Sequence, residues 1–190
     1  ETGDYNGTAT NVTFGYDGTD SNIAYTQDKP YGNIDVGFAP DLVWIKNRDT
    51  TSDHLVFDTV RGVQERIFPN ETYQESNSST SLTSFDSNGF TVGLDANING
   101  DGNDIVAWAW KAADTTTTIA ANTVGNTIAS DVRANTDAGF SIVKYTGSSG
   151  ATKTVGHGLS AVPEMIILKN ISDSSQHWAV YHSATGNDQV

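Results

Sequence analysis

The part of this sequence best suited to binding a ligand is the polar loop Asp95–Asp104 (DANINGDGND). Its oxygen-bearing side chains recur at every second position up to residue 101 and end with a further acid; they are Asp95, Asn97, Asn99, Asp101 and Asp104. Carboxylate and amide oxygens are the hard ligands that Ca²⁺ takes in proteins. The spacing therefore predicts these five residues as ligands of a calcium-like site, and Ca²⁺ is the one candidate cofactor.

A second interpretation of this loop needs no metal. An EF-hand loop carries Glu at its twelfth position, where this sequence has Val106, and no helix is predicted on either side. Asn, Asp and Gly are also common in solvated connections between strands. The sequence leaves the calcium site and the simple connection open.

Catalytic chemistry is not indicated by the remaining polar residues. The histidines are His54, His157, His177 and His182, and neither a G-x-S-x-G nor an H-E-x-x-H motif accompanies them. No pair of acids is marked out for glycoside hydrolysis. We therefore interpret the histidines as structural, expect no catalytic residues, and do not expect an enzyme.

Aromatic side chains offer a different kind of site, because an exposed indole face can stack on a sugar ring. The four candidates are Trp44, Trp108, Trp110 and Trp178. Most of them lie in alternating strand patterns, which favours a place in the core. The ligand-binding residues are therefore not identified at this stage.

The elements that would position these residues are short strands. Asp41–Asn47 and His54–Thr59 predict one hairpin, and Leu82–Phe85 with Phe90–Leu94 predict another around a D-S-N-G turn. Ile105–Ala112 (IVAWAWKA) is apolar on both faces, which predicts a central strand. Ser, Thr, Asn and Gly are abundant and form helices poorly, so we expect an all-β, antiparallel, sandwich-like fold.

An internal repeat is the most informative pattern. Pro40–His54 (PDLVWIKNRDTTSDH) matches Pro163–His177 (PEMIILKNISDSSQH) at positions numbered 123 apart. Pro40, Lys46, Asn47 and His54 recur unchanged in the second copy, and the apolar run keeps its character. After one inserted residue, Gly62 matches Gly186.

The repeat predicts two related units in series. We expect a first β module over residues 1–113, a Thr/Asn/Ala-rich linker over residues 114–138, and the start of a second, related module over residues 139–190. A short helix over Ile128–Ala134 is an alternative within the linker. The second copy has no counterpart of the segment from Gly62 to Trp110, so we expect it to be incomplete. Either a longer polypeptide, which we favour, or another chain supplies the missing strands.

Composition excludes several classes of partner. The chain has 190 residues, a formal net charge of −13 and no cysteine. So acidic a surface repels phosphate backbones, and nucleic acid is not an expected partner. The longest apolar run has six residues, against the ~20 of a membrane helix, so membrane insertion is not expected.

The chain resembles a domain repeated in tail-fibre and other virion structural proteins of bacteriophages, especially marine ones. The resemblance is carried by PDLVWIKNRDTTSDHLVFDTVRG, SLTSFDSNGFTVG and DIVAWAWKA, and again by GFSIVKYTG, VGHGLSAVPEMIILKN and HWAVYHSATG. These motifs cover most of residues 34–112 and 139–187. The resemblance implies a virion or extracellular fibre and transfers no catalytic residue.

We therefore expect a structural or adhesive component of an extracellular viral appendage. Its expected partners are further copies of itself or neighbouring subunits of a fibre, and a host-surface glycan. Two alternatives remain: a subunit of an extracellular filament assembled by strand complementation between neighbours, and, less favoured, a polysaccharide-acting enzyme.

Overall fold

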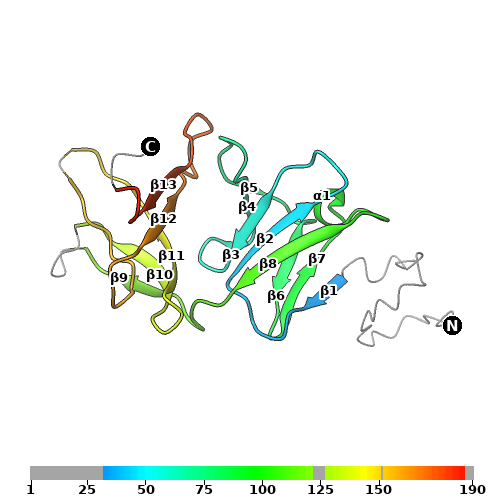
Figure 1. The fold of residues 1–190 in the computed structure, drawn as a ribbon, viewed down its shortest axis with the longest axis horizontal. Helices are drawn as coiled ribbons and strands as arrows, with labels where there is room; N and C mark the ends of the chain where they lie inside the picture. Colours follow the sequence, from blue (N-terminus) through cyan, green and yellow to red (C-terminus); the bar gives the residue numbers. More distant parts are fainter. Residues whose placement is uncertain (1–31, 122–126, 151, 187–190) are drawn as a thin grey trace.

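The protein is built almost entirely from β-strands, as the computed structural model in Figure 1 shows. The structure describes residues 32–121, 127–150 and 152–186. They form an N-terminal unit, residues 32–113, and a C-terminal unit, residues 114–186. The predicted all-β, antiparallel and sandwich-like fold is confirmed. Within these residues, no helix has the length and apolar character that crossing a bilayer would require.

Two antiparallel sheets make up the N-terminal unit. The larger has the order β5-β4-β3-β2-β8, with β2 (Leu42–Asn47), β3 (Leu55–Asp58), β4 (Gly62–Ile67), β5 (Ser76–Asn77) and β8 (Ile105–Trp110). The smaller has the order β1-β7-β6, with β1 (Gly32–Asp35), β6 (Leu82–Phe85) and β7 (Gly89–Val92). Both predicted hairpins are present, as β2–β3 and β6–β7.

The core of the N-terminal unit lies between these sheets. Its buried side chains come from both of them and from the short helix α1 (Ala96–Asn99); they include Val43, Ile45, Leu55, Phe57, Leu82, Phe90, Val92 and Ile98. Buried and half-buried side chains alternate along β2, because successive side chains of a strand point to opposite faces. Trp44 and Lys46 therefore lie on the face of β2 that is turned away from this core.

Strand β8 lies at the edge of its sheet among the described residues, so the predicted central position is wrong. Ile105 and Ala109 pack against the core, whereas Trp108 and Trp110 on the opposite face are 45% and 37% exposed. Exposed apolar side chains are common on protein surfaces. A strand pattern that is apolar on both faces therefore does not distinguish a buried central strand from an edge strand that carries exposed aromatic residues.

The C-terminal unit contains a three-stranded sheet in the order β11-β10-β9. Its strands are β9 (Thr117–Ile119), β10 (Ser130–Asn135) and β11 (Phe140–Tyr145). The alternative of a helix over Ile128–Ala134 is wrong, because β10 forms six residue pairs with β11 there. The segment expected as a linker thus supplies two strands, and pairing with β11 outweighs its weak local preference.

The second copy of the repeat forms a separate hairpin of β12 (Met165–Leu168) and β13 (Ala179–His182). Its register equals that of β2–β3: Leu42 is opposite Asp58, and their counterparts Met165 and His182 are opposite each other. The same holds for the next three pairs of each hairpin. The two similar sequences therefore fold into the same local structure.

The loops of the two hairpins also share their hydrogen bonds. In the first loop Asp49 N donates to Asn47 Oδ1 at 3.0 Å, and Lys46 Nζ donates to Thr50 O at 3.1 Å. The counterparts in the second loop are Ser172 N to Asn170 Oδ1 at 3.0 Å and Lys169 Nζ to Asp173 O at 3.5 Å. The Lys-Asn pair is thus identical in the two copies because it closes the loop.

The two units are joined by a buried carboxylate. Asp41, which is 2% exposed, accepts a hydrogen bond from Arg133 Nη1 of β10 at 2.5 Å. The same carboxylate accepts from Ala112 N at 2.8 Å and from Thr59 Oγ1 at 3.2 Å. Since a buried carboxylate is costly without partners, this cluster ties β10 to the start of β2.

Two aromatic contacts extend the junction. Trp178 Nε1 donates to Phe68 O at 2.9 Å and to Glu71 O at 3.1 Å. Trp110 of β8 stacks on Phe140 of β11, with ring centroids 6.4 Å apart. The repeat hairpin and the three-stranded sheet are therefore both anchored on the N-terminal unit.

Replacing the two main anchors should separate the units. The double variant Arg133→Ala/Trp178→Ala should lower the free energy of unfolding of the N-terminal unit by about 3 kcal/mol, because the buried Asp41 carboxylate keeps fewer partners. Small-angle scattering should show a larger radius of gyration, and urea unfolding should split into two transitions.

The matched control is Arg48→Ala/Trp108→Ala, which removes the same residue types at exposed positions. It should keep the scattering profile of the parent protein. An unchanged profile and a single transition for the Arg133/Trp178 variant would show that these contacts do not hold the units together.

Candidate functional site

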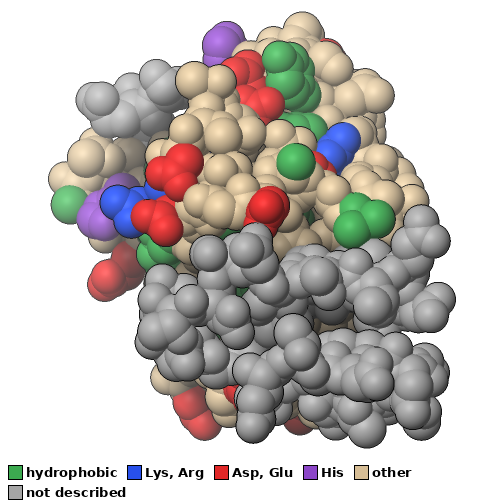
Figure 2. Space-filling model, turned by 90° about the vertical axis from the view of Figure 1, so that its right-hand side faces the viewer, with side chains coloured by type: hydrophobic (Ala, Val, Ile, Leu, Met, Phe, Trp, Pro, Cys, Tyr) green, Lys and Arg blue, Asp and Glu red, His purple; other side chains and the backbone are tan. Residues whose placement is uncertain are grey.

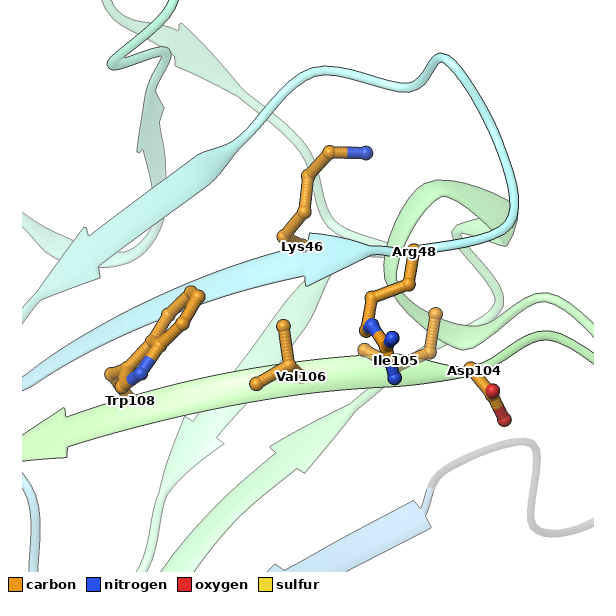
Figure 3. Close-up of a pocket in the computed structure, with 6 residues that line it drawn as sticks. All are labelled: Lys46, Arg48, Asp104, Ile105, Val106 and Trp108. Atoms are coloured by element: carbon orange, nitrogen blue, oxygen red, sulfur yellow. The ribbon is translucent and has the colours of Figure 1, made fainter.

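An open surface hollow of about 650 Å³ lies along β8 and the end of β2 (Figure 3). It is lined by Trp108, Val106, Ile105 and Asp104 from β8 and its preceding loop, and by Lys46 and Arg48. The pairing of β2 with β8 brings these residues together, because Lys46 is opposite Val106 and Trp44 is opposite Trp108. The hollow therefore combines an exposed indole with cationic and anionic groups.

Trp108 is the tryptophan best placed to serve as a stacking platform. Trp178 is held by two backbone carbonyls, and Trp110 is stacked on Phe140. Trp44 is half-buried and donates its Nε1–H to His54. Trp108 is 45% exposed and meets Trp44 edge-on, with ring centroids 6.0 Å apart. Its neighbour thus supports the indole from one side, which reduces the entropy lost when a ligand stacks on it.

The charged groups of the hollow are unequally engaged. Lys46 Nζ donates to the carbonyls of Asn47 and Thr50 and so serves the hairpin loop. The exposed Arg48 guanidinium has no hydrogen bond or ion pair within the described part of the chain. Its backbone N–H is fixed by Asp104 O at 2.8 Å. A planar guanidinium in the same hollow as an indole suits a polyhydroxylated or acidic ligand, because it donates several hydrogen bonds in fixed directions.

The predicted calcium ligands have structural roles in the loop before β8. Asp95 caps α1, since its Oδ1 accepts from Asn97 N at 3.0 Å, and it pairs with Arg66 at 3.2 Å. Asn97 Nδ2 also donates to Asp95, and Asn99 Nδ2 donates to Gly93 O at 2.7 Å. The oxygens of Asp95 are therefore engaged by donors of the protein itself.

The other two predicted ligands, Asp101 and Asp104, are exposed. Asp104 N donates to Asp49 Oδ2 at 2.6 Å, which ties this loop to the loop after β2. Among the residues that the structure describes, no group of three or more acids or histidines is arranged to hold a metal ion. The geometry favours the interpretation of the loop as a connection, and the calcium site stays a prediction.

The histidines lie at separate places. His157 Nδ1 accepts from Leu159 N, and His182 Nδ1 accepts from Ala184 N, each at 3.1 Å. His177 is exposed. His54 Nδ1 accepts the indole N–H of Trp44 at 2.9 Å, with the two rings edge-on. His54 thus orients Trp44, on which Trp108 rests.

The pKa of His54 lies below its ordinary value. Burial of the imidazole is the largest cause, the charge of Lys46 lowers the pKa further, and the charge of Asp53 opposes them. The hydrogen bond with Trp44 requires an unprotonated Nδ1, because a protonated nitrogen would present a second donor to the indole N–H. The neutral imidazole is therefore the form that fits this site.

The sequence analysis did not identify Arg133, which joins the two units, or Arg48, which lines the hollow. Arg133 lies in a segment of small and polar residues, and nothing local marks it as the partner of Asp41. Arg48 is one of several polar residues in a loop. The one available signal was the acid after Pro40, which recurs as Glu164 after Pro163.

On the part of the surface that Figure 2 shows in colour, charge is dispersed rather than gathered at one place. Figure 2 shows the face at the N-terminal unit's side, where acidic side chains are scattered over uncharged surface and basic ones are few. This is consistent with the net charge of −13. The hollow thus places two basic residues, Lys46 and Arg48, on a molecule of net negative charge.

The fold and the hollow define an all-β, sandwich-like protein with an exposed aromatic and cationic surface site. The chain belongs to the family described as a domain of unknown function, DUF7483, which matches residues 5–190. None of the curated proteins or solved structures compared with the chain matches it.

We expect the free energy of unfolding to fall as the pH drops below about 6.5, the pKa of an unperturbed histidine. The pKa of His54 is lower in the folded state, so the unfolded state takes up the proton first, and the loss is complete below the folded pKa. The variant His54→Gln should flatten this part of the pH profile, as measured by urea unfolding between pH 4.5 and 8.

His177→Gln, at the equivalent position of the second hairpin, should not reproduce this flattening. If the two variants change the profile equally, the Trp44–His54 contact is not its source.

Proposed function

We propose that this protein is a structural and adhesive building block of an extracellular viral appendage, of the tail-fibre type. The observation that carries the proposal is the serial arrangement of two units that share one hairpin design and are anchored to each other. A fibre gains length by adding modules, and it stays stiff when each junction is fixed by buried contacts.

The junction supports this role. Asp41 is almost fully buried and pairs with Arg133 of the following unit, and Trp178 reaches back to two carbonyls of the preceding one. A flexible linker would leave the two units free to rotate, whereas these contacts restrict their relative orientation. A restricted orientation is what a load-transmitting, elongated appendage needs.

The hollow at Trp108 supports the adhesive part of the proposal. An indole face binds the apolar face of a sugar ring, and the Arg48 guanidinium can donate to hydroxyl or carboxylate groups of the same ligand. Both side chains are exposed and come from neighbouring parts of one sheet. We therefore infer that the ligand is a host-surface glycan, with acidic sugars preferred.

Antibody labelling tests the structural role. Gold-labelled antibodies raised against this chain should decorate thin fibres on virions in electron micrographs of the source particles. Labelling of free filaments without virions would instead favour the alternative of a cellular filament. Labelling of neither would contradict the proposal.

Binding to a glycan array tests the adhesive role. Trp108→Ala should weaken binding to acidic glycans at least tenfold, because the stacking surface for the sugar ring is lost. The control is Trp110→Phe, which keeps an aromatic ring against Phe140 outside the hollow. Equal binding by the parent and the Trp108 variant would remove the hollow from the adhesive role.

A further inference from the structure

Strand β12 is paired on one side only among the described residues, where β12 and β13 form a two-stranded sheet. All four of its residues are apolar and exposed: Met165 54%, Ile166 38%, Ile167 50% and Leu168 43%. An apolar strand with an unpaired edge is a template for a further strand. The hairpin therefore presents a surface of the kind that proteins use for strand addition.

The first copy of the repeat shows what such an edge receives. β2, the counterpart of β12, pairs with β3 on one side and with β8 on the other, both antiparallel. Val43 and Ile45 of β2 are 0% and 1% exposed in that setting. Their counterparts Ile166 and Leu168 remain exposed, although the two hairpins have the same register.

The ends of the β2–β8 ladder give a second, independent comparison. There Asp41 N donates to Trp110 O and Arg48 N donates to Asp104 O, each at 2.8 Å. The counterparts Glu164 N and Ile171 N have no acceptor within the described residues. The backbone donors that close the ladder in the first copy thus stand unused in the second.

The acid at the start of each hairpin differs in the same way. Asp41 is buried and accepts from Ala112 N, immediately after β8. Glu164 is exposed, and its carboxylate accepts no hydrogen bond from the part of the chain that the structure describes. The open edge of β12, the unused backbone donors at its two ends and the exposed Glu164 carboxylate have one explanation in common. Each lacks the partner that a strand in the position of β8 supplies in the first copy.

We propose that the open edge of β12 binds an extended strand that has the residue pattern of β8 and runs antiparallel to β12. The pattern is alternation of small and aromatic residues, as in IVAWAW. This inference concerns assembly at β12 and does not depend on the viral role or on the hollow at Trp108.

The side-chain sizes explain the pattern. In the register of the first copy, Ala107 and Ala109 are opposite Ile45 and Val43, and Ala109 packs against the core. The same register would set small residues opposite Leu168 and Ile166. Aromatic residues would then meet Ile167 and Met165, which are smaller than the Trp44 that β8 meets in the first copy. The segment would cover the apolar residues of β12 and supply its missing backbone partners.

The probe is a synthetic, fluorescently labelled peptide with the sequence of residues 104–112, DIVAWAWKA. It should bind the full chain saturably. The peptide with Ala107→Pro should bind at least tenfold more weakly, because proline lacks the backbone donor and disrupts the ladder. Hydrogen exchange should slow at β12 on binding and stay unchanged at β2.

Two protein variants locate the site. Ile167→Lys on β12 should weaken peptide binding at least tenfold, and Val180→Lys on β13 should leave it unchanged; both residues are about half exposed, so both variants should fold. No binding by the parent, equal binding by both peptides, or new protection at β2 would overturn the proposal. Self-association of the parent that Ile167→Lys abolishes would replace the proposed segment by a second copy of the chain.

Discussion

The burial of the Asp41 carboxylate sets most of the constraints on this structure. A carboxylate withdrawn from water costs several kcal/mol unless hydrogen bonds and opposite charge offset it. Here the offset comes from Ala112 N after β8, Thr59 after β3 and Arg133 of β10, with Lys111 at 3.5 Å. This one carboxylate at the start of β2 therefore fixes the positions of β2, β3 and β8 relative to the C-terminal unit.

The second hairpin lacks such a constraint, and this separates local from long-range structure. Register, loop hydrogen bonds and the lysine that closes the loop are the same in the two copies. The burial of the two hairpins differs: the Ile45 side chain is 1% exposed, and its counterpart Leu168 is 43% exposed. The hairpin is thus specified by its own sequence, whereas its burial depends on strands that lie elsewhere.

This division explains what the sequence could predict. Alternating residues, a polar loop and the repeat were enough for β2–β3 and for β12–β13, because these elements depend on neighbours in sequence. The edge position of β8 and the strand β10 depend on pairing with distant segments, which local pattern does not contain. The Asp95 loop shows the same limit: its spacing suggested a metal site, but Arg66, 29 residues away, and Ser81 occupy the carboxylate.

The candidate hollow could be anticipated only in part, for the same reason. The sequence makes all four tryptophans candidates for an exposed indole, yet only the fold separates Trp108 from Trp178, which is bound to carbonyls 107 and 110 residues earlier. Arg48 became significant because the β2–β8 register brings the end of one strand beside the start of the other. A binding surface assembled across a sheet is a property of the pairing.

The treatment of the sheet edges connects structure to assembly. Natural proteins protect exposed edges with short strands, charges or covering segments. Lys111, which follows β8, pairs with Asp41 and Asp114. Lys169, which follows β12, donates to Gln176 O of its own loop and to Thr72 O of the N-terminal unit. Neither lysine therefore places a free charge at the edge of the strand that it follows. An apolar edge without a charged side chain to protect it is a template for pairing with a further strand, and β12 has this character among the described residues.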